Sequence, residues 1–213
     1  MGWDDDFFAA AAKIPTFALA VVVNGEIVFS HNGNARLCSC STFKPITGTA
    51  IMRLVQDGRI DLDVPIETLS SQWELCDPRY GRTVTLRMLL SHTSGIDDTG
   101  EQGWLTPLQL KSLPFVAPPG RAFRYSNVGV DLAGRVAAEI CGKDFGVMVK
   151  ELVLDPLGMS ATEWEGNIYP SGGNSTTVLD LAKIATEHLG HGQLLSRDSL
   201  AEMHRTHADS YTN

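Results

Sequence analysis

Two short runs of β-branched and aromatic residues near the start of the chain predict a β-hairpin. The first run covers residues 17–23, and the second covers residues 27–29. Asn24-Gly25 lies between them, and both residue types tolerate the positive φ angles that a tight hairpin turn requires. We therefore expect two antiparallel strands at the beginning of the fold.

An apolar stripe at helical spacing predicts a helix from about Thr42 to Gln56. Pro45 fits this helix because it lies in the first turn, where its missing N–H is not needed. The helix start places Ser41 at the N-terminus, where backbone N–H groups and the helix dipole favour developing negative charge. The stripe consists of Ile46, Ala50, Ile51, Leu54 and Val55.

Helical patterns dominate the rest of the chain. Capping residues such as Thr85, Thr177 and Ser196 precede apolar stripes, and glycines such as Gly142 and Gly190 follow them. Because two strands alone seldom form a stable sheet, we expect the hairpin to need either packed helices or further strands. The sequence predicts no further strands. The expected helices cover residues 85–90, a segment beginning at Thr106-Pro107, and residues 128–140, 145–154, 177–190 and 196–205.

The composition narrows the class of protein. The 213 residues are 43% hydrophobic and 20% charged, which is typical of a globular protein with a sizeable core. We expect a single domain over residues 1–213. The net charge of −8, with no basic stripe, argues against a nucleic-acid partner. No apolar run approaches the length needed to span a bilayer.

The cysteines and the first residues bear on metal binding and on the compartment. Cys38 and Cys40 are too close in sequence for an easy mutual disulfide, and the absence of C-x-x-C pairs argues against a zinc site. We expect these two, Cys76 and Cys141 to be reduced thiols, which fits a reducing compartment. Residues 1–6 are acidic and lack the features of a secretory signal, so we expect a cytoplasmic protein.

Two short motifs carry the candidate chemistry. Ser41-Thr42-Phe43-Lys44 is an S-x-x-K sequence, and Tyr125-Ser126-Asn127 is a Y-x-N sequence. Residues three apart share a helix face, so Lys44 can hold its amine close to the Ser41 hydroxyl. A serine needs such a neighbour to become a nucleophile. S-x-x-K alone also occurs by chance on surface helices, but here it follows a hairpin and opens an apolar helix. The pairing suggests acyl transfer through a serine ester.

Further motifs accompany these two in a fixed order. They are Leu89-Leu90-Ser91-His92-Thr93-Ser94-Gly95, Pro118-Pro119-Gly120, Asp155-Pro156-Leu157-Gly158-Met159 and Ser171-Gly172-Gly173. The combined set resembles the β-lactamase-related serine hydrolases, which include class C β-lactamases, D-alanyl-D-alanine carboxypeptidases, D-aminopeptidases and esterases. The resemblance extends over about residues 17–204. It implies an α/β (α+β) fold of the β-lactamase/transpeptidase-like type, in which a helical lobe packs on an antiparallel sheet.

The resemblance also implies roles for individual residues. Ser41 would be the nucleophile, Lys44 would take or relay its proton, and Tyr125 would be the second acid/base group. Asn127 would bind the substrate amide and help to position Lys44. Tyr125 would have to act well below its free pKa of about 10. The backbone N–H of Ser41 would form half of an oxyanion hole, and no metal or organic cofactor is implied.

One expected motif is not found. The family carries a Lys-Thr-Gly or His-Thr-Gly triplet on a later strand, and no such triplet follows Gly173. His92-Thr93-Ser94-Gly95 is similar but belongs to an earlier loop. We therefore expect a C-terminally truncated domain whose C-terminal strands lie in a missing segment or in a second chain.

These observations leave several functions open. The first is a serine hydrolase acting on a small ester, amide or β-lactam, with small esters or amides favoured over β-lactam resistance. The alternatives are a catalytically inactive, penicillin-binding-like ligand-binding module and an incomplete fragment of the hydrolase. We expect His92 to have a structural role in its loop. Four other histidines do not have the spacing of metal ligands and are expected at the surface: His188, His191, His204 and His207.

Overall fold

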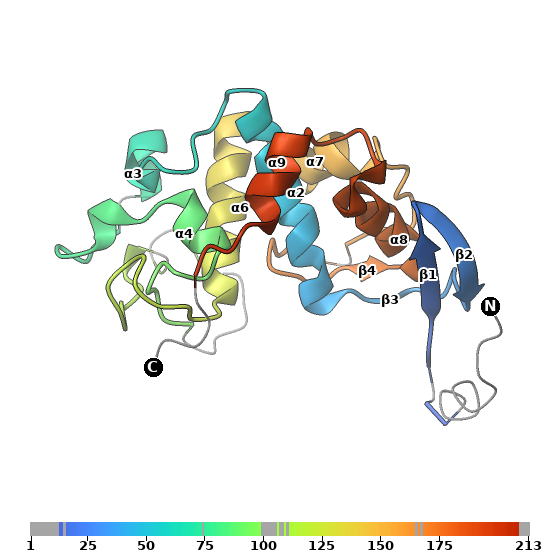
Figure 1. Cartoon of the computed structure of the whole chain (residues 1–213). Helices are drawn as coiled ribbons and strands as arrows, with labels where there is room; N and C mark the ends of the chain where they lie inside the picture. The colour runs from blue at the N-terminus through green and yellow to red at the C-terminus, as the bar shows by residue number, and fades with distance from the viewer. Residues whose placement is uncertain are drawn as a thin grey trace.

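The computed structural model describes residues 13–14, 16–73, 75–98, 106, 109, 111–164, 166 and 168–208. Helices form the centre of the molecule, and a β-hairpin forms one end (Figure 1). The central helix α2 (Lys44–Gln56) packs against α6 (Asn127–Cys141) and α9 (Arg197–His204). In the described part of the chain, no helix is both long and apolar enough to cross a membrane.

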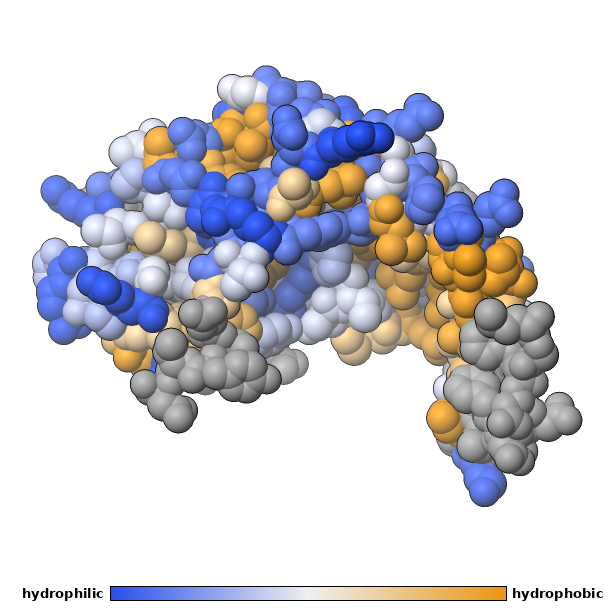
Figure 2. Space-filling view, viewed as in Figure 1, coloured by the Kyte–Doolittle hydropathy of each residue, from blue (hydrophilic) through white to orange (hydrophobic). Residues whose placement is uncertain are grey.

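The hairpin is confirmed. Strand β1 (Leu19–Val23) pairs antiparallel with β2 (Glu26–His31), and a bulge lies between Val21 and Val22. The turn residues Asn24 and Gly25 have φ angles of 52° and 83°, the left-handed values expected from this pair. Helix α8 (Val178–Thr186) packs against both strands. The hairpin end of the molecule carries an apolar surface (Figure 2), and its exposed residues include Val23, Ile27 and Val28.

A second antiparallel pair was not predicted. Strand β3 (Leu37–Cys38) pairs with β4 (Ser175–Thr176). Two residues are too few to show an alternating pattern, so only the tertiary fold reveals these strands. The pair matters because it joins the segment before Ser41 to the segment that follows Ser171-Gly172-Gly173. The described part of the chain therefore contains two small antiparallel sheets and a helical body, as the α/β (α+β) fold class predicts.

The predicted helices are found with small changes at their ends. A 3-10 turn (Cys40–Phe43) precedes α2, so the α-helix begins at Lys44 rather than Thr42, with Pro45 in its first turn. Helix α4 (Leu86–Leu90) is capped by Thr85 as expected. The helix expected from Thr106-Pro107 lies largely outside the described residues. The other helices and turns are α3 (Ile66–Leu69), α7 (Phe145–Val149), the 3-10 turns Ser71–Trp73 and Gly81–Thr83, and the π-helical turns Lys150–Leu154 and Glu187–His191.

The buried core lies where these helices meet. It is formed by apolar side chains that are fully or almost fully removed from solvent, including Phe43, Ile46, Leu54, Leu132 and Met148. The predicted stripe of α2 supplies Ile46, Ala50, Ile51 and Leu54, whereas Val55 is only partly buried. The burial of Phe43 fixes the turn that carries Ser41.

His191 and His204 are exposed as predicted, but His188 and His207 are only partly exposed, which corrects the sequence prediction for these two. His188 is the more informative case. It lies half-buried on the π-helical turn Glu187–His191. Its Nε2 lies 2.9 Å from Thr49 Oγ1, and its Nδ1 lies 3.0 Å from His204 Nε2. A π-helical turn contains more residues than an α-helical turn, so the residues after it face a different direction from the one that a regular α-helix predicts. The exposure of His188 could therefore not be predicted from α-helical spacing.

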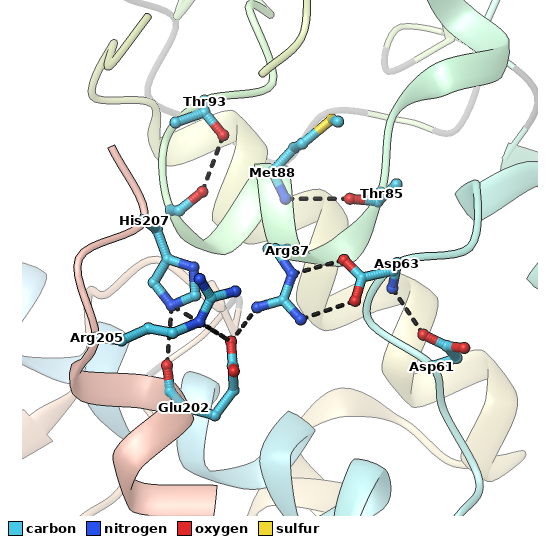
Figure 3. Close-up of polar contacts among 10 residues, drawn as sticks. Asp61, Asp63, Thr85, Arg87, Met88, Thr93, Glu202, Arg205 and His207 are labelled. Atoms are coloured by element: carbon cyan, nitrogen blue, oxygen red, sulfur yellow. Dashed lines mark hydrogen bonds and ion pairs between the residues drawn. The ribbon is translucent and has the colours of Figure 1, made fainter. Parts of the chain in front are cut away.

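An ion-pair cluster fixes α9 to the helical body (Figure 3). Arg87 on α4 donates two hydrogen bonds to Asp63, at 2.6 and 2.8 Å. The same guanidinium contacts Glu202 on α9, and Glu202 also accepts a hydrogen bond from Arg205. The cluster therefore joins α4, α9 and the loop that contains Asp63.

Candidate active site

The nucleophile candidate lies in a tight turn ahead of the central helix. Ser41 is the second residue of the 3-10 turn Cys40–Phe43, and Lys44 is the first residue of α2. Lys44 Nζ donates a hydrogen bond of 2.9 Å to Ser41 Oγ. The three-residue spacing thus brings the two side chains together, as the sequence predicted. The first N–H groups of a helix have no intrahelical partner, so this turn also offers backbone donors for an oxyanion.

The Y-x-N motif brings the next two side chains to the same place. Ser126 caps α6 by accepting a 2.9 Å hydrogen bond from the Gly129 N–H, which makes Asn127 the first residue of that helix. Asn127 Oδ1 accepts a 2.8 Å hydrogen bond from Lys44 Nζ. The Tyr125 hydroxyl lies 2.7 Å from Ser41 Oγ. The structure therefore brings Ser41, Lys44, Tyr125 and Asn127 into one hydrogen-bonded group.

The third wall of the site is the Ser171-Gly172-Gly173 segment. The Ser171 carbonyl accepts a 2.8 Å hydrogen bond from Lys44 Nζ. Gly172 packs so closely on the Cys40 backbone that a Cβ atom there would lie 2.5 Å from the Cys40 carbonyl oxygen. Ser39 N donates to Asn174 O at 2.7 Å, which fixes the two segments side by side. Glycine is required at position 172 because only it permits this approach.

Two carboxylates that the sequence analysis did not select orient these groups. Asp98 Oδ2 accepts hydrogen bonds from the Asn127 backbone N–H, at 3.0 Å, and from Asn127 Nδ2, at 3.1 Å. The second bond turns the amide so that its oxygen faces Lys44. Asp131 Oδ1 accepts a 2.7 Å hydrogen bond from the Ser171 N–H. Asp131 lies four residues after Asn127, on the same helix face, and that spacing could have revealed it, whereas Asp98 has no comparable pattern.

His92 supports Tyr125, in line with the structural role expected for its loop. Its Nδ1 accepts a 3.1 Å hydrogen bond from the Ser126 N–H, and its ring stacks on Tyr125 at a centroid distance of 4.6 Å. Burial and the nearby Lys44 charge lower the pKa of His92 below 6.5. The imidazole is therefore neutral at pH 7, as a hydrogen-bond acceptor must be.

The charge of Lys44 acts on Tyr125. Burial by itself would raise the pKa of Tyr125, but the Lys44 and Ser41 side chains outweigh burial and hold this pKa below 10.0. Lys44 Nζ also lies 4.9 Å from the centre of the Tyr125 ring, close enough for a cation–π interaction. A lowered pKa makes the phenol easier to ionise, and a phenolate next to a serine hydroxyl can accept the serine proton.

A cavity of about 420 Å³ opens beside Ser41 and Asn127. Its lining combines the nucleophile with polar and small residues, namely Cys38, Cys40, Ser41, Asn127, Val128, Asp131, Tyr169, Ser171, Gly172 and Gly173. This volume suits a small acyl group. Among the described residues, no cluster of three or more His, Cys, Asp or Glu side chains has the arrangement of a metal site.

Comparison with known proteins agrees with this arrangement. A family model described as Beta-lactamase matches residues 5–213. Penicillin-binding protein 4 of Amycolatopsis lactamdurans is 27% identical over an alignment of 179 residues, and the match covers 74% of this chain and 47% of that protein. The chain thus spans about half the length of this relative.

Two solved structures extend the comparison. A β-lactamase from Mycobacterium bovis matches with a TM-score of 0.71 and 26% identity, covering 91% of this chain and 63% of that chain. A D-stereospecific amidohydrolase from Streptomyces matches with a TM-score of 0.72 and 25% identity, covering 89% of this chain and 71% of that chain. The family match covers nearly all residues that build the fold and the site. The chain therefore belongs to the β-lactamase family.

Proposed function

We propose that this protein is a serine hydrolase that forms an acyl-enzyme on Ser41. The observation that carries the proposal is the continuous set of contacts from Tyr125 through Ser41 and Lys44 to Asn127. A serine held between an amine and a phenol of lowered pKa is the arrangement that nucleophilic catalysis requires. The substrate class is a small ester, amide or β-lactam.

The contacts of Lys44 favour Tyr125 as the first proton acceptor. Lys44 Nζ points at three acceptors: Ser41 Oγ, Asn127 Oδ1 and the Ser171 carbonyl. An ammonium group has three N–H donors, so these acceptors use all of them. In that state Lys44 has no free lone pair, and the Ser41 proton passes to the Tyr125 oxygen. The ammonium then stabilises the phenolate before the reaction and the oxyanion charge during it.

The reaction then has two stages. Ser41 Oγ attacks the substrate carbonyl while its proton moves to Tyr125, and the tetrahedral intermediate places its oxyanion near the Ser41 N–H. Collapse breaks the bond to the leaving group, which takes the proton back from Tyr125. Water then attacks the ester carbonyl while Tyr125 takes its proton. Collapse breaks the bond between the acyl carbon and Ser41 Oγ, Tyr125 returns the proton to Ser41, and the acid leaves. Asn127 Nδ2 is held by Asp98, while its oxygen holds Lys44 for both stages.

The names of the relatives point to substrates with a hydrolysable amide. One relative is a penicillin-binding protein and one structural neighbour is a D-stereospecific amidohydrolase. We propose small esters or amides as the preferred substrates, with β-lactams as slower acylating agents. An inactive ligand-binding module is the competing function, and acylation separates the two.

The test is intact-mass analysis after exposure to a labelled penicillin and, separately, to a fluorophosphonate. We expect a single adduct that is absent from Ser41→Ala, because only an activated serine reacts with both reagents. Cooperative thermal unfolding of both proteins serves as the control for folding. A folded chain that binds penicillin without forming a covalent adduct would be a binding module, and the hydrolase proposal would be rejected.

A further inference from the structure

Two cysteines lie side by side at the rim of the proposed active site. The Sγ atoms of Cys38 and Cys40 are 3.4 Å apart, and both residues are exposed free thiols. Both line the cavity that contains Ser41. Cys38 ends strand β3, and Cys40 immediately precedes Ser41. None of the roles proposed above uses either thiol.

The backbone explains why these thiols meet although the spacing argued against it. Ser39 has helical angles, with φ −69° and ψ −26°, and so ends the extended strand. Cys40 has a φ angle of 45°, a left-handed value that is uncommon outside glycine and costs energy. This bend folds the chain back on itself and turns both side chains the same way. A disulfide bond is about 2.05 Å long, so the two sulfur atoms need only a small movement to bond.

The same residues are joined to the catalytic groups. Cys38 pairs with Ser175 across the β3–β4 ladder, and the Cys40 carbonyl packs on Gly172. The residue before Gly172 is Ser171, whose carbonyl holds Lys44. A movement of the Cys40 backbone would therefore displace the adjacent Ser41 N–H. It would also displace the Lys44 amine, because Cys40 packs on Gly172 and the Ser171 carbonyl is hydrogen-bonded to that amine. Misplacement of reacting groups by about 1 Å can reduce a rate about a hundredfold.

We propose that Cys38 and Cys40 form a redox modification site, closing reversibly to a disulfide by exchange with a low-molecular-weight disulfide such as oxidised glutathione. The closed form acylates Ser41 more slowly than the dithiol form. This second part rests on the proposed function, whereas the disulfide itself does not. In a reducing compartment, disulfides of this kind are transient and sense the redox state.

The disulfide between Cys38 and Cys40 would form in two successive thiol–disulfide exchange reactions with oxidised glutathione. One cysteine thiolate attacks a sulfur of oxidised glutathione, forms a mixed disulfide and displaces one glutathione thiolate. The other cysteine thiolate attacks the protein sulfur of that mixed disulfide and displaces the second glutathione thiolate. The two released thiolates take up the two protons that the cysteines lost. The protein is oxidised by two electrons, and one molecule of oxidised glutathione becomes two of reduced glutathione.

The test compares the protein before and after incubation with excess oxidised glutathione. Free thiols are alkylated, and peptide mapping locates the remaining disulfide, while the rate of fluorophosphonate labelling reports Ser41. We expect the peptide containing Cys38 and Cys40 to lose two hydrogens and to resist alkylation. We expect labelling to slow by at least about tenfold and to recover with dithiothreitol.

Matched variants identify the thiols that respond. Each protein is compared with its own reduced form, so differences in basal activity do not matter. Cys38→Ser/Cys40→Ser should label at the same rate before and after oxidation. Cys76→Ser and Cys141→Ser remove the other free thiols and should respond as the unmodified chain does.

Three results would overturn all or part of the proposal. If Cys38 and Cys40 of the folded chain remain alkylatable in excess oxidised glutathione, no redox site exists. If the disulfide forms and labelling is unchanged, the site does not regulate Ser41. If the reduced chain never labels, the proposed function fails and the regulatory part falls with it, while peptide mapping still decides whether the disulfide forms.

Discussion

Within the proposed active site, Tyr125 is the acid–base candidate whose pKa the neighbouring residues lower. Its oxygen is 2.7 Å from Ser41 Oγ, and the Lys44 charge lies close to its ring. Burial raises the pKa of Tyr125, but the hydrogen bonds and charge of Lys44 and the hydrogen bond of Ser41 lower it by more, so the pKa lies below 10.0. The rate of Ser41 acylation should therefore follow the ionised fraction of Tyr125.

The resulting prediction concerns pH. As pH rises through the lowered pKa, the phenolate fraction and the acylation rate should rise together, with a midpoint below 10.0. Tyr125→Phe should lose this dependence and react about 10²–10⁴-fold more slowly, the usual contribution of an acid–base group. Fluorophosphonate labelling rates measured from pH 5 to the onset of unfolding would check both points. An unchanged profile in Tyr125→Phe would assign the base to another group.

Asp131 is a positioning residue, because it acts on Lys44 through the Ser171 segment. Asp131 Oδ1 accepts a 2.7 Å hydrogen bond from the Ser171 N–H. The Ser171 carbonyl in turn accepts a 2.8 Å hydrogen bond from Lys44 Nζ. Burial raises the pKa of Asp131 above 3.8 despite its hydrogen bonds to Ser171. The ionised form is thus less favourable in the folded than in the unfolded protein, so its contribution to stability falls as pH rises through the raised pKa.

Two variants of Asp131 separate the hydrogen bond from the charge. Asp131→Ala removes the acceptor and should slow acylation by about 10–100-fold through misplacement of Lys44. Asp131→Asn keeps an acceptor oxygen and should restore most of the rate without weakening the fold at neutral pH. Labelling rates and urea unfolding of both variants provide the measurement. Equal losses in the two variants would show that the charge, not the hydrogen bond, is needed.

At the scale of elements, local chemistry made several helices predictable. Thr85, Thr177 and Ser196 each accept a backbone hydrogen bond at a helix start, as their positions in the sequence indicated. The Asn24-Gly25 turn is equally local. The β3–β4 pair and the π-helical turns depend on contacts between distant segments, such as Leu37 with Thr176. No short window of sequence contains that information.

The N-terminal cap of α6 gives a prediction that separates an effect on stability from an effect on the acylation of Ser41. Ser126→Ala removes the acceptor for the Gly129 N–H and should cost about 1 kcal/mol of unfolding free energy. Because Ser126 also sets the position of Asn127, acylation should slow as well. Ser196→Ala is the matched control, since it removes the cap of α9 away from Ser41 and should reduce stability alone. Similar acylation rates in the two variants would contradict this link.

At the scale of the whole molecule, the Arg87 cluster links segments far apart in sequence (Figure 3). The hydrogen bond from Arg87 is the largest influence that lowers the pKa of Asp63. For Glu202, burial acts to raise the pKa, but the bonds from Arg205 and Arg87 prevail and lower it. Lowered carboxyl pKa values give stability that is present above the unfolded-state pKa and is lost as pH falls.

Arg87→Met should therefore change how the free energy of unfolding depends on pH in the acidic range. The unmodified chain should lose stability as pH falls below about 5, where unfolded-state carboxyl groups begin to take up protons. The variant should be less stable at pH 7 and should lose less on acidification. Urea unfolding between pH 3 and 7 measures both effects. Arg79→Met removes the exposed pair with Asp77 and should change the curve much less, since exposed ion pairs contribute little. Parallel curves would rule out this contribution.

The sequence could identify the four residues of the site but not how they are held. Ser41 and Lys44 are three apart, so helix geometry alone brings them together. Tyr125 and Asn127 could be assigned only through the family resemblance, because no local rule relates residues 41 and 125. The contacts of Asp98 and of the Ser171 carbonyl could be identified only from the tertiary structure. The family fold could be anticipated, whereas the supporting groups depend on this chain's own packing.

The three contacts of Lys44 have a consequence for the order in which the chain is made. Ser41 and Lys44 leave the ribosome long before residue 171, whose carbonyl completes the surroundings of the amine. Until then the serine is an ordinary alcohol, because its neighbours have no fixed positions. On the proposed mechanism, a nascent chain that ends before residue 171 would therefore carry no activated serine for a substrate to acylate. We expect Ser41 to become reactive only once residue 171 is in place beside Lys44.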